Sequence, residues 1–195
     1  MALTIPKSWK DVSINQFLQI HAALEMRDVD TLDRNIYLAA ALLNTSADWV
    51  EDNMTLQQIG RLVRETSFAQ EEPKGKVKKY FWLAGRLWKV ELEAKNITPA
   101  QFFDISTYTK TPQETVDNVA KIMATICRPV FGKYDSNKIE ARAKLFGEKM
   151  RFDMAYATAL FFWSLYNKFC DAILTSLAER LKEKTNQLEA LNQGG

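Results

Sequence analysis

The segment Lys10–Ile20, KDVSINQFLQI, carries the pattern on which the predicted fold depends. Ser13 is followed three residues later by Gln16, which is the capping-box spacing that satisfies free backbone amides at the start of a helix. The segment Lys95–Ile105, KNITPAQFFDI, repeats this pattern with Thr98 in place of the serine and with identical Lys, Gln, Phe and Ile positions. The sequence therefore predicts two helices that begin in closely similar ways.

Each of these helix starts precedes a second predicted helix. Leu32–Leu43 and Asn118–Ile126 carry apolar residues at helical spacing and follow the two copies at nearly the same distance. Capping boxes are common, so the likeness is open to two interpretations: shared capping chemistry alone, or two related helical lobes over 10–43 and 95–126.

Further boundaries follow from the same signals. Thr55 with Gln58 and Thr111 with Glu114 repeat the capping spacing. Prolines also stand at the first helical position after Thr98 and Thr111. The remaining predicted segments are a helix over 55–66, a helix from 112, a loop over 128–135, a short helix over 137–149 and a long helix from about 153.

One stretch between the two copies breaks the helical pattern. YFWLAGRLWKVEL, residues 80–92, is rich in aromatic and aliphatic residues around Ala84–Gly85, and it predicts a β-hairpin near 78–92 with strands over 78–83 and 87–92. A bare two-stranded hairpin is only marginally stable in water, so its apolar side chains must lie against helices or a partner. These side chains are Phe81, Trp82, Leu83, Leu87, Trp88 and Val90, and we expect Phe81, Trp82 and Trp88 to contribute to partner binding.

The C-terminal segment changes character after residue 170. Its apolar positions form a narrow seam with charged residues on the other faces, as in a coiled coil. This stripe either folds back on the body or protrudes to meet a second copy or a partner helix. The candidate partner-binding residues of the seam are Leu174, Leu177, Leu181, Leu188 and Leu191.

These elements together predict a mainly α fold. We expect two related helical lobes joined by a small β-hairpin, with a long C-terminal helix. The predicted organisation is a helical body over 1–170 and a C-terminal amphipathic helix and tail over 171–195.

The composition excludes several classes of function. The 195 residues carry 26 Lys and Arg against 24 Asp and Glu, so the net charge of +2 directs the chain toward no particular partner. The longest nearly apolar run, Met154–Leu165, is too short for a membrane helix, and the N-terminus has no secretory pattern. Cys127 and Cys170 lie in apolar stretches and are expected to be buried thiols, which indicates an intracellular, soluble protein without membrane contact.

Catalytic chemistry has no recognisable signature in this sequence. His21 is the only histidine, so multi-histidine metal sites are excluded, and a structural role is the expected one for it. The glycines form neither a phosphate-binding loop nor a dinucleotide fingerprint. We therefore predict a non-enzymatic protein with no catalytic, cofactor-binding or metal-binding residues.

A basic and aromatic segment, Lys74–Lys89, raises the alternative of nucleic-acid binding. Lysines interleaved with aromatic rings can pair with phosphates while bases stack on the rings. Acidic pairs at 71–72 and at 91 and 93 bracket the segment, however, and lysines also protect exposed strand edges from aggregation. Nucleic acid is therefore the less favoured partner.

Several short motifs taken in order resemble a known group of proteins. IPKSWKDVSINQF, FWLAGRLWKVEL, KNITPAQFFDI, ICRPVFGKY and ALFFWSLYNKF resemble small virion-assembly proteins of tailed bacteriophages, and the nearest likeness is to tail assembly chaperones. The resemblance covers Ile5 to Phe169 and depends on the order of elements rather than on one diagnostic motif.

The resemblance implies a function in phage assembly. Such a chaperone binds the tape-measure protein, keeps its apolar helices soluble and assists assembly of the tail tube in the host cytoplasm. It is expected to form homo-oligomers, to have no catalytic residues and, in some cases, to exist also in a frameshifted longer form. The alternative is a structural neck or tail subunit that stays in the virion.

Overall fold

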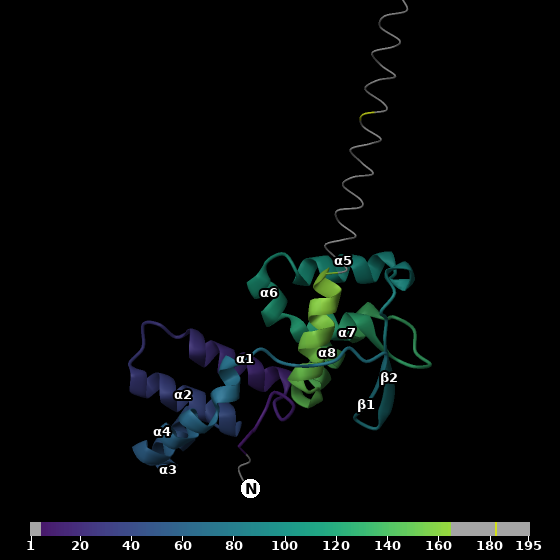
Figure 1. The fold of residues 1–195 in the computed structure, drawn as a ribbon. Helices are drawn as coiled ribbons and strands as arrows, with labels where there is room; N and C mark the ends of the chain where they lie inside the picture. The colour runs from purple at the N-terminus through teal and green to yellow at the C-terminus, as the bar shows by residue number, and fades with distance from the viewer. Residues whose placement is uncertain (1–4, 165–181, 183–195) are drawn as a thin grey trace, which may run out of the picture. The chain divides into compact units, whose positions relative to one another are not determined.

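The computed structural model describes residues 5–164 and Lys182. The chain divides into two compact units, Met1–Ala159 and Leu160–Gly195. In the first unit, helices predominate and a small three-stranded antiparallel sheet accompanies them (Figure 1). The predicted mainly α fold with a β-hairpin is confirmed. Residues 152–159 of the first unit and 160–164 of the second are helical, whereas the five seam leucines lie outside the described residues.

The N-terminal helices of the first unit pack on one another. α1 packs on α2, which also contacts α3 and α4, and the four lie together on the left of Figure 1. Helix α3 was not predicted from the sequence, although the Ser46 hydroxyl accepts a hydrogen bond from the Trp49 amide as an ordinary N-cap. The bounds are α1 Ile14–Glu25, α2 Thr31–Leu43, α3 Ala47–Asn53 and α4 Leu56–Glu65, followed by a 3₁₀ turn at Ser67–Gln70.

The C-terminal half of the first unit is centred on α8. This helix packs closely on α7 and also contacts α1. Beyond its end, the Ile14 amide donates to the Met150 carbonyl at 3.3 Å and the Phe152 amide donates to the Val12 carbonyl at 2.8 Å. The bounds are α5 Pro99–Tyr108, α6 Pro112–Asp117, α7 Val119–Ile126 and α8 Ile139–Lys149, with 3₁₀ turns at Ala94–Asn96 and Ser136–Lys138.

The four predicted capping sites all cap a helix, but they do so differently. Reciprocal boxes form at Thr55 with Gln58 and at Thr98 with Gln101. At the first helix, the Gln16 side chain instead donates to the Ala41 and Leu42 carbonyls of α2, each at 3.0 Å. Tertiary contact has therefore replaced half of the expected local box.

The two sequence copies share this tertiary contact. Gln101 accepts from the Thr98 amide at 3.1 Å and donates to the Thr125 carbonyl near the end of α7 at 2.9 Å, as Gln16 donates near the end of α2. In each copy, the glutamine joins its helix to the last turn of the helix that follows in the repeat. The two copies thus share this glutamine contact, although α6 intervenes between α5 and α7, and their relation as two lobes stays a prediction.

The sheet consists of β1 Tyr80–Leu83, β2 Arg86–Val90 and β3 Cys127–Pro129 in the order β1-β2-β3. The predicted hairpin is confirmed, and its turn places Ala84 and Gly85 at φ 50° and 71°. The loop expected at Arg128–Pro129 is wrong, because these residues pair with β2. Pro129 is tolerated there because the missing amide would point away from β2 at the sheet edge.

The capping glutamines give a matched test of the lobe contact. We expect Gln101→Glu to lower the free energy of unfolding by about 1–3 kcal/mol, because the new carboxylate cannot donate to the buried Thr125 carbonyl. Gln58→Glu is the control, because Gln58 accepts from the Thr55 amide in an exposed capping box and a glutamate keeps this acceptor. This variant should change the free energy of unfolding by less than about 0.5 kcal/mol. Urea unfolding of both variants measures the difference, and equal losses would contradict this account.

Candidate partner-binding site

The inner face of the sheet is part of the hydrophobic core. Phe81 and Trp88 are paired across the hairpin and are 7% and 3% exposed. Both rings meet Phe146 of α8, with ring centroids 6.2 Å and 4.8 Å away, and the Trp88 indole donates to the Leu83 carbonyl at 3.1 Å. Two of the three hairpin residues expected at a partner interface therefore pack inside the protein.

The outer face of the sheet carries the exposed aromatic residues. Trp82 is 68% exposed and Tyr80 is 49% exposed, and both lie on β1 with Leu87 and Lys89 as their partners on β2. The Val130 amide donates to the Leu87 carbonyl at 3.1 Å, so a row of three apolar side chains crosses the sheet. We define the outer sheet face as Tyr80, Trp82, Leu87, Lys89, Arg128 and Val130.

A buried carboxylate organises the polar part of this face. Glu91 is 4% exposed and accepts from Lys89 at 3.2 Å, from Arg128 at 3.2 Å and from Asn96 at 3.0 Å. Burial by itself raises the pKa of the Glu91 carboxyl, but the Asn96 hydrogen bond and the two cations outweigh it and lower the pKa. The network links β2 to β3 and fixes both cations on the outer sheet face.

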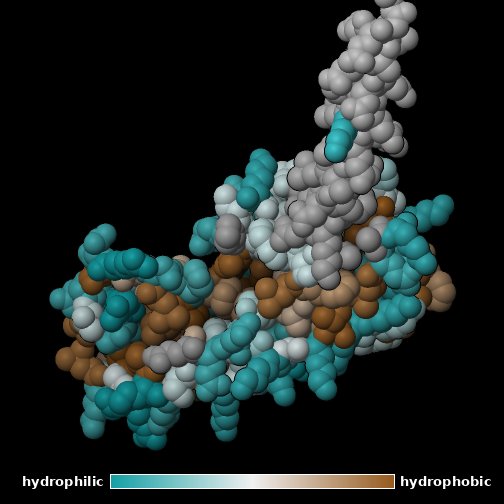
Figure 2. Space-filling view, turned by 45° about the horizontal axis from the view of Figure 1, so that its top comes forward, coloured by the Kyte–Doolittle hydropathy of each residue, from teal (hydrophilic) through white to brown (hydrophobic). Residues whose placement is uncertain are grey.

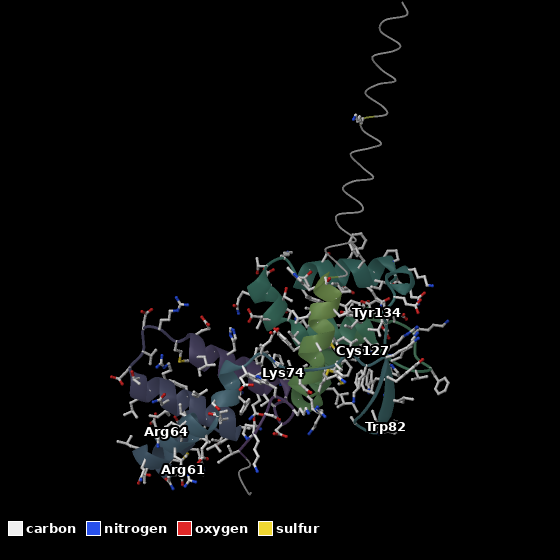
Figure 3. All side chains as sticks on the ribbon, in the orientation of Figure 1. Arg61, Arg64, Lys74, Trp82, Cys127 and Tyr134 are labelled. Atoms are coloured by element: carbon white, nitrogen blue, oxygen red, sulfur yellow. The ribbon has the colours of Figure 1, made fainter. Side chains whose placement is uncertain are left out.

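The basic segment that suggested nucleic-acid binding is not one surface. Lys74 lies in a hollow with Trp9 and Asp153, far from Trp82 at the hairpin (Figure 3). A Cβ atom on the neighbouring Gly75 would overlap the Asp153 carbonyl, so the chain there presses against the helix over 152–164. Within residues 5–164, the exposed cations without an ion pair in the chain leading from Gly75 to the hairpin, in the hairpin and in the loop after β3 are Lys76, Lys78, Lys79, Arg86 and Lys133.

The cysteine and the histidine singled out in the sequence have different surroundings in the described part of the chain. The Cys127 thiol is buried, and this burial raises its pKa. His21 borders a different hollow of about 320 Å³, between α1 and α6, together with Glu25 and Asp117. Among residues 5–164 and Lys182, no three His, Cys, Asp or Glu side chains are grouped as a metal site.

A tyrosine and an arginine close the region behind β3. The Tyr134 hydroxyl donates to the Asp104 carboxylate of α5, and burial and the nearby Asp104 raise the pKa of Tyr134. Arg142 on α8 is buried, and one of its guanidinium nitrogens has no hydrogen-bond partner within the described residues. The Tyr134–Asp104 hydrogen bond holds the loop after β3 against α5.

Some residues of the outer sheet face were missed by the sequence analysis. Leu87 was named among the apolar hairpin side chains but not as a partner-binding residue, and Tyr80 and Arg128 could have been found from the strand alternation once β3 was recognised as a strand. Phe131, which follows Val130 directly, is fully exposed. The sequence analysis placed it in a loop and gave it no role.

Comparisons of the chain with known proteins and structures found no relative. No family model matches the chain, and neither a curated protein nor a solved structure matches it. In the described ranges, no helix combines the length and apolar character that a membrane span needs. The candidate site therefore depends on the exposed side chains of the sheet.

The two tryptophans of the hairpin are expected to differ sharply in their contribution to stability. Trp88→Ala should lower the free energy of unfolding by about 3–5 kcal/mol because it leaves a cavity against Phe146. Trp82→Ala should cost at most about 1 kcal/mol because only its cross-strand contact with Leu87 is lost. Chemical denaturation followed by far-UV circular dichroism distinguishes them, and similar losses would refute the assignment of the two faces.

The Glu91 network predicts a specific dependence of stability on acid. A carboxyl whose pKa is lowered on folding stabilises the protein fully at a pH above its ordinary pKa of 4.5. This contribution is lost as the pH falls through the lowered pKa of the folded state. We expect Glu91→Gln to lower stability by about 1–3 kcal/mol at neutral pH and to flatten the loss in acid. Urea unfolding across pH, with the exposed Glu93→Gln as control, measures this, and an unchanged acid profile would contradict it.

Proposed function

We propose that this chain is a non-enzymatic tail assembly chaperone of a tailed bacteriophage. In this proposal it binds the tape-measure protein in the host cytoplasm and assists assembly of the tail tube around it. The observation that carries the proposal is the outer sheet face, where Trp82, Tyr80 and Leu87 are exposed on a strand pair seated on the core. The sequence resemblance to tail assembly chaperones supplies the class of client.

The outer sheet face has the composition of a protein-binding surface. Trp and Tyr supply large contact areas with few rotatable bonds, and they dominate the binding energy of many interfaces. The core packing of Phe81 and Trp88 beneath them holds these groups in place before a client arrives. Such pre-organisation lowers the entropic cost of binding an apolar segment.

A second exposed apolar area supports a chaperone that contacts its client at several points. Apolar side chains reach the surface among charged ones over the α1–α4 half of the first unit (Figure 2). The exposed large apolar residues of this half are Leu24, Val29, Leu32, Tyr37, Trp49 and Leu56. Separate apolar contacts of this kind suit a long client and also self-association into a homo-oligomer.

The other candidate functions have less support. A structural neck or tail subunit would use the same apolar areas in permanent contacts, so only its presence in the particle separates it from a chaperone. Nucleic-acid binding is less supported because the basic segment does not form one continuous surface. Lys74 lies apart from the hairpin, and Glu91 forms ion pairs with both Lys89 and Arg128.

Coexpression with the tape-measure protein of the same phage tests the proposal. We expect the tape-measure protein to be insoluble alone and to purify as a soluble complex with the full chain, because apolar helices are covered by the chaperone. The tube subunit expressed with the tape-measure protein in place of this chain serves as the control.

Two results would overturn this function. Absence of a complex with the tape-measure protein would remove the client. Recovery of the chain in stoichiometric amounts from purified phage particles would establish a structural subunit instead.

A further inference from the structure

The strand β1 presents an unpaired edge of the sheet. The Val90 amide donates to the Lys79 carbonyl at 2.9 Å, and this fixes the direction of alternate backbone groups along the hairpin. The backbone groups of Phe81 and Leu83 therefore face β2, whereas those of Tyr80 and Trp82 face away from the sheet. Within the described ranges, no third strand pairs with β1. The amides and carbonyls of Tyr80 and Trp82 are thus available to an added strand.

The charges beside this edge select the partner. Lys78 and Lys79 directly precede Tyr80, and Arg86 lies across the hairpin from Leu83, so cations stand at both ends of β1. By strand alternation, Lys78 shares the face of Tyr80, whereas Lys79 and Arg86 lie on the face of Phe81. None of the three makes an ion pair within residues 5–164. Antiparallel pairing of Tyr80 with Trp82 of a second copy would place Lys79 opposite Leu83 and Lys78 opposite Ala84, so the lysines would gain no carboxylate partner. The flanking cations instead complement carboxylates, so an acidic extended segment fits the edge.

A peptide fits the edge better than a nucleic acid does. Phosphates can accept hydrogen bonds from the edge amides, but they leave the carbonyls of Tyr80 and Trp82 without donors. The buried Glu91 carboxylate also compensates Lys89 and Arg128 on the neighbouring face, which weakens attraction for phosphate there. An extended peptide supplies both donors and acceptors, as well as side chains for the apolar row.

We propose that β1 captures an extended, acidic segment of a client protein by strand addition. The segment pairs with the backbone of Tyr80 and Trp82, places an apolar side chain against the row of Trp82, Leu87 and Val130, and directs carboxylates to the flanking cations. This inference rests on the proposed function only in that the segment belongs to the client. It assigns the edge and the outer sheet face as one binding site for acidic strands.

Binding of synthetic peptides to the full chain tests the inference. The probe is a fluorescein-labelled peptide with an alternating Val-Thr core and Asp-Glu flanks, and the matched peptide carries Lys-Arg flanks on the same core. Fluorescence anisotropy should show binding of the acidic peptide and at least about tenfold weaker binding of the basic one. Equal affinity for the two peptides would overturn the charge selection.

Substitutions locate the site on the sheet. We expect Trp82→Ala to weaken binding of the acidic peptide by about tenfold or more, while Phe103→Ala, which removes a similarly exposed aromatic ring on α5, leaves it unchanged. Lys78→Glu with Lys79→Glu should remove the preference for acidic flanks, whereas the charge-matched Lys144→Glu with Lys149→Glu on α8 should retain it. Insensitivity to the sheet substitutions would place the peptide elsewhere and refute the site.

A proline at the edge tests strand addition itself. Tyr80→Ala and Tyr80→Pro both remove the phenol ring, but only proline removes the outward amide that an added strand would use. We expect the proline variant to bind the acidic peptide at least about fivefold more weakly than the alanine variant, with similar thermal unfolding of the two. Equal binding would exclude strand addition.

The remaining outcomes separate this inference from the proposed function. Displacement of the peptide by oligothymidylate at equal concentration would identify a nucleic-acid site. Self-association that is abolished by Trp82→Ala in sedimentation experiments would identify a second copy as the occupant. Either result overturns the inference.

A soluble tape-measure complex that survives Trp82→Ala together with Lys78→Glu and Lys79→Glu would refute the inference and leave the proposed function standing. Selective binding of the acidic peptide without any tape-measure complex would support the inference and refute the function.

Discussion

The packing of Phe146 against the inner face of the sheet is the contact on which the candidate site depends. Phe146 is fully buried on α8, with the Trp88 ring 4.8 Å away on β2. The same helix packs on α7 and α1, and the chain just beyond it pairs with the backbone at Val12 and Ile14. A small hairpin that would be marginal alone thus gains a rigid support. This support allows Trp82 to stay exposed on the opposite face without loss of the fold.

The two faces of the hairpin divide stability from recognition. Phe81 and Trp88 stabilise the fold by burying apolar surface, whereas Tyr80 and Trp82 are exposed to solvent and available to a partner. Glu91 connects the two roles, because its carboxylate is buried while its cationic partners are on the outer sheet face. The cost of burying this charge is offset by three hydrogen-bonded partners, and the result is a fixed pattern of charge around exposed aromatic rings.

Local chemistry was predictable from the sequence, whereas the choice of buried face was not. The capping pairs and the Ala84–Gly85 turn depend on neighbouring residues, so their signals are complete within a few positions. Both faces of the hairpin are apolar, however, and the distant Phe146 decides which face is buried. β3 escaped prediction because Pro129 is typical of a loop, and its place in the sheet depends on pairing with residues about forty positions earlier. Gln16 and Gln101 show the same limit, since their caps were foreseen but their bonds to α2 and α7 were not.

The backbone pairing of Val12 with Phe152 has a consequence for the order of folding during synthesis. The hydrogen bond at 2.8 Å joins residues from opposite ends of the first unit. The contacts of α1 with α2 join neighbouring parts of the sequence, so they can form as soon as both helices have left the ribosome. Trp9 can meet Phe17 and Phe68 earlier, but its contact with Phe152 and the backbone bond of Val12 form only after residue 152 has emerged. Completion of the first unit is therefore a late step of folding that follows the formation of its early helices.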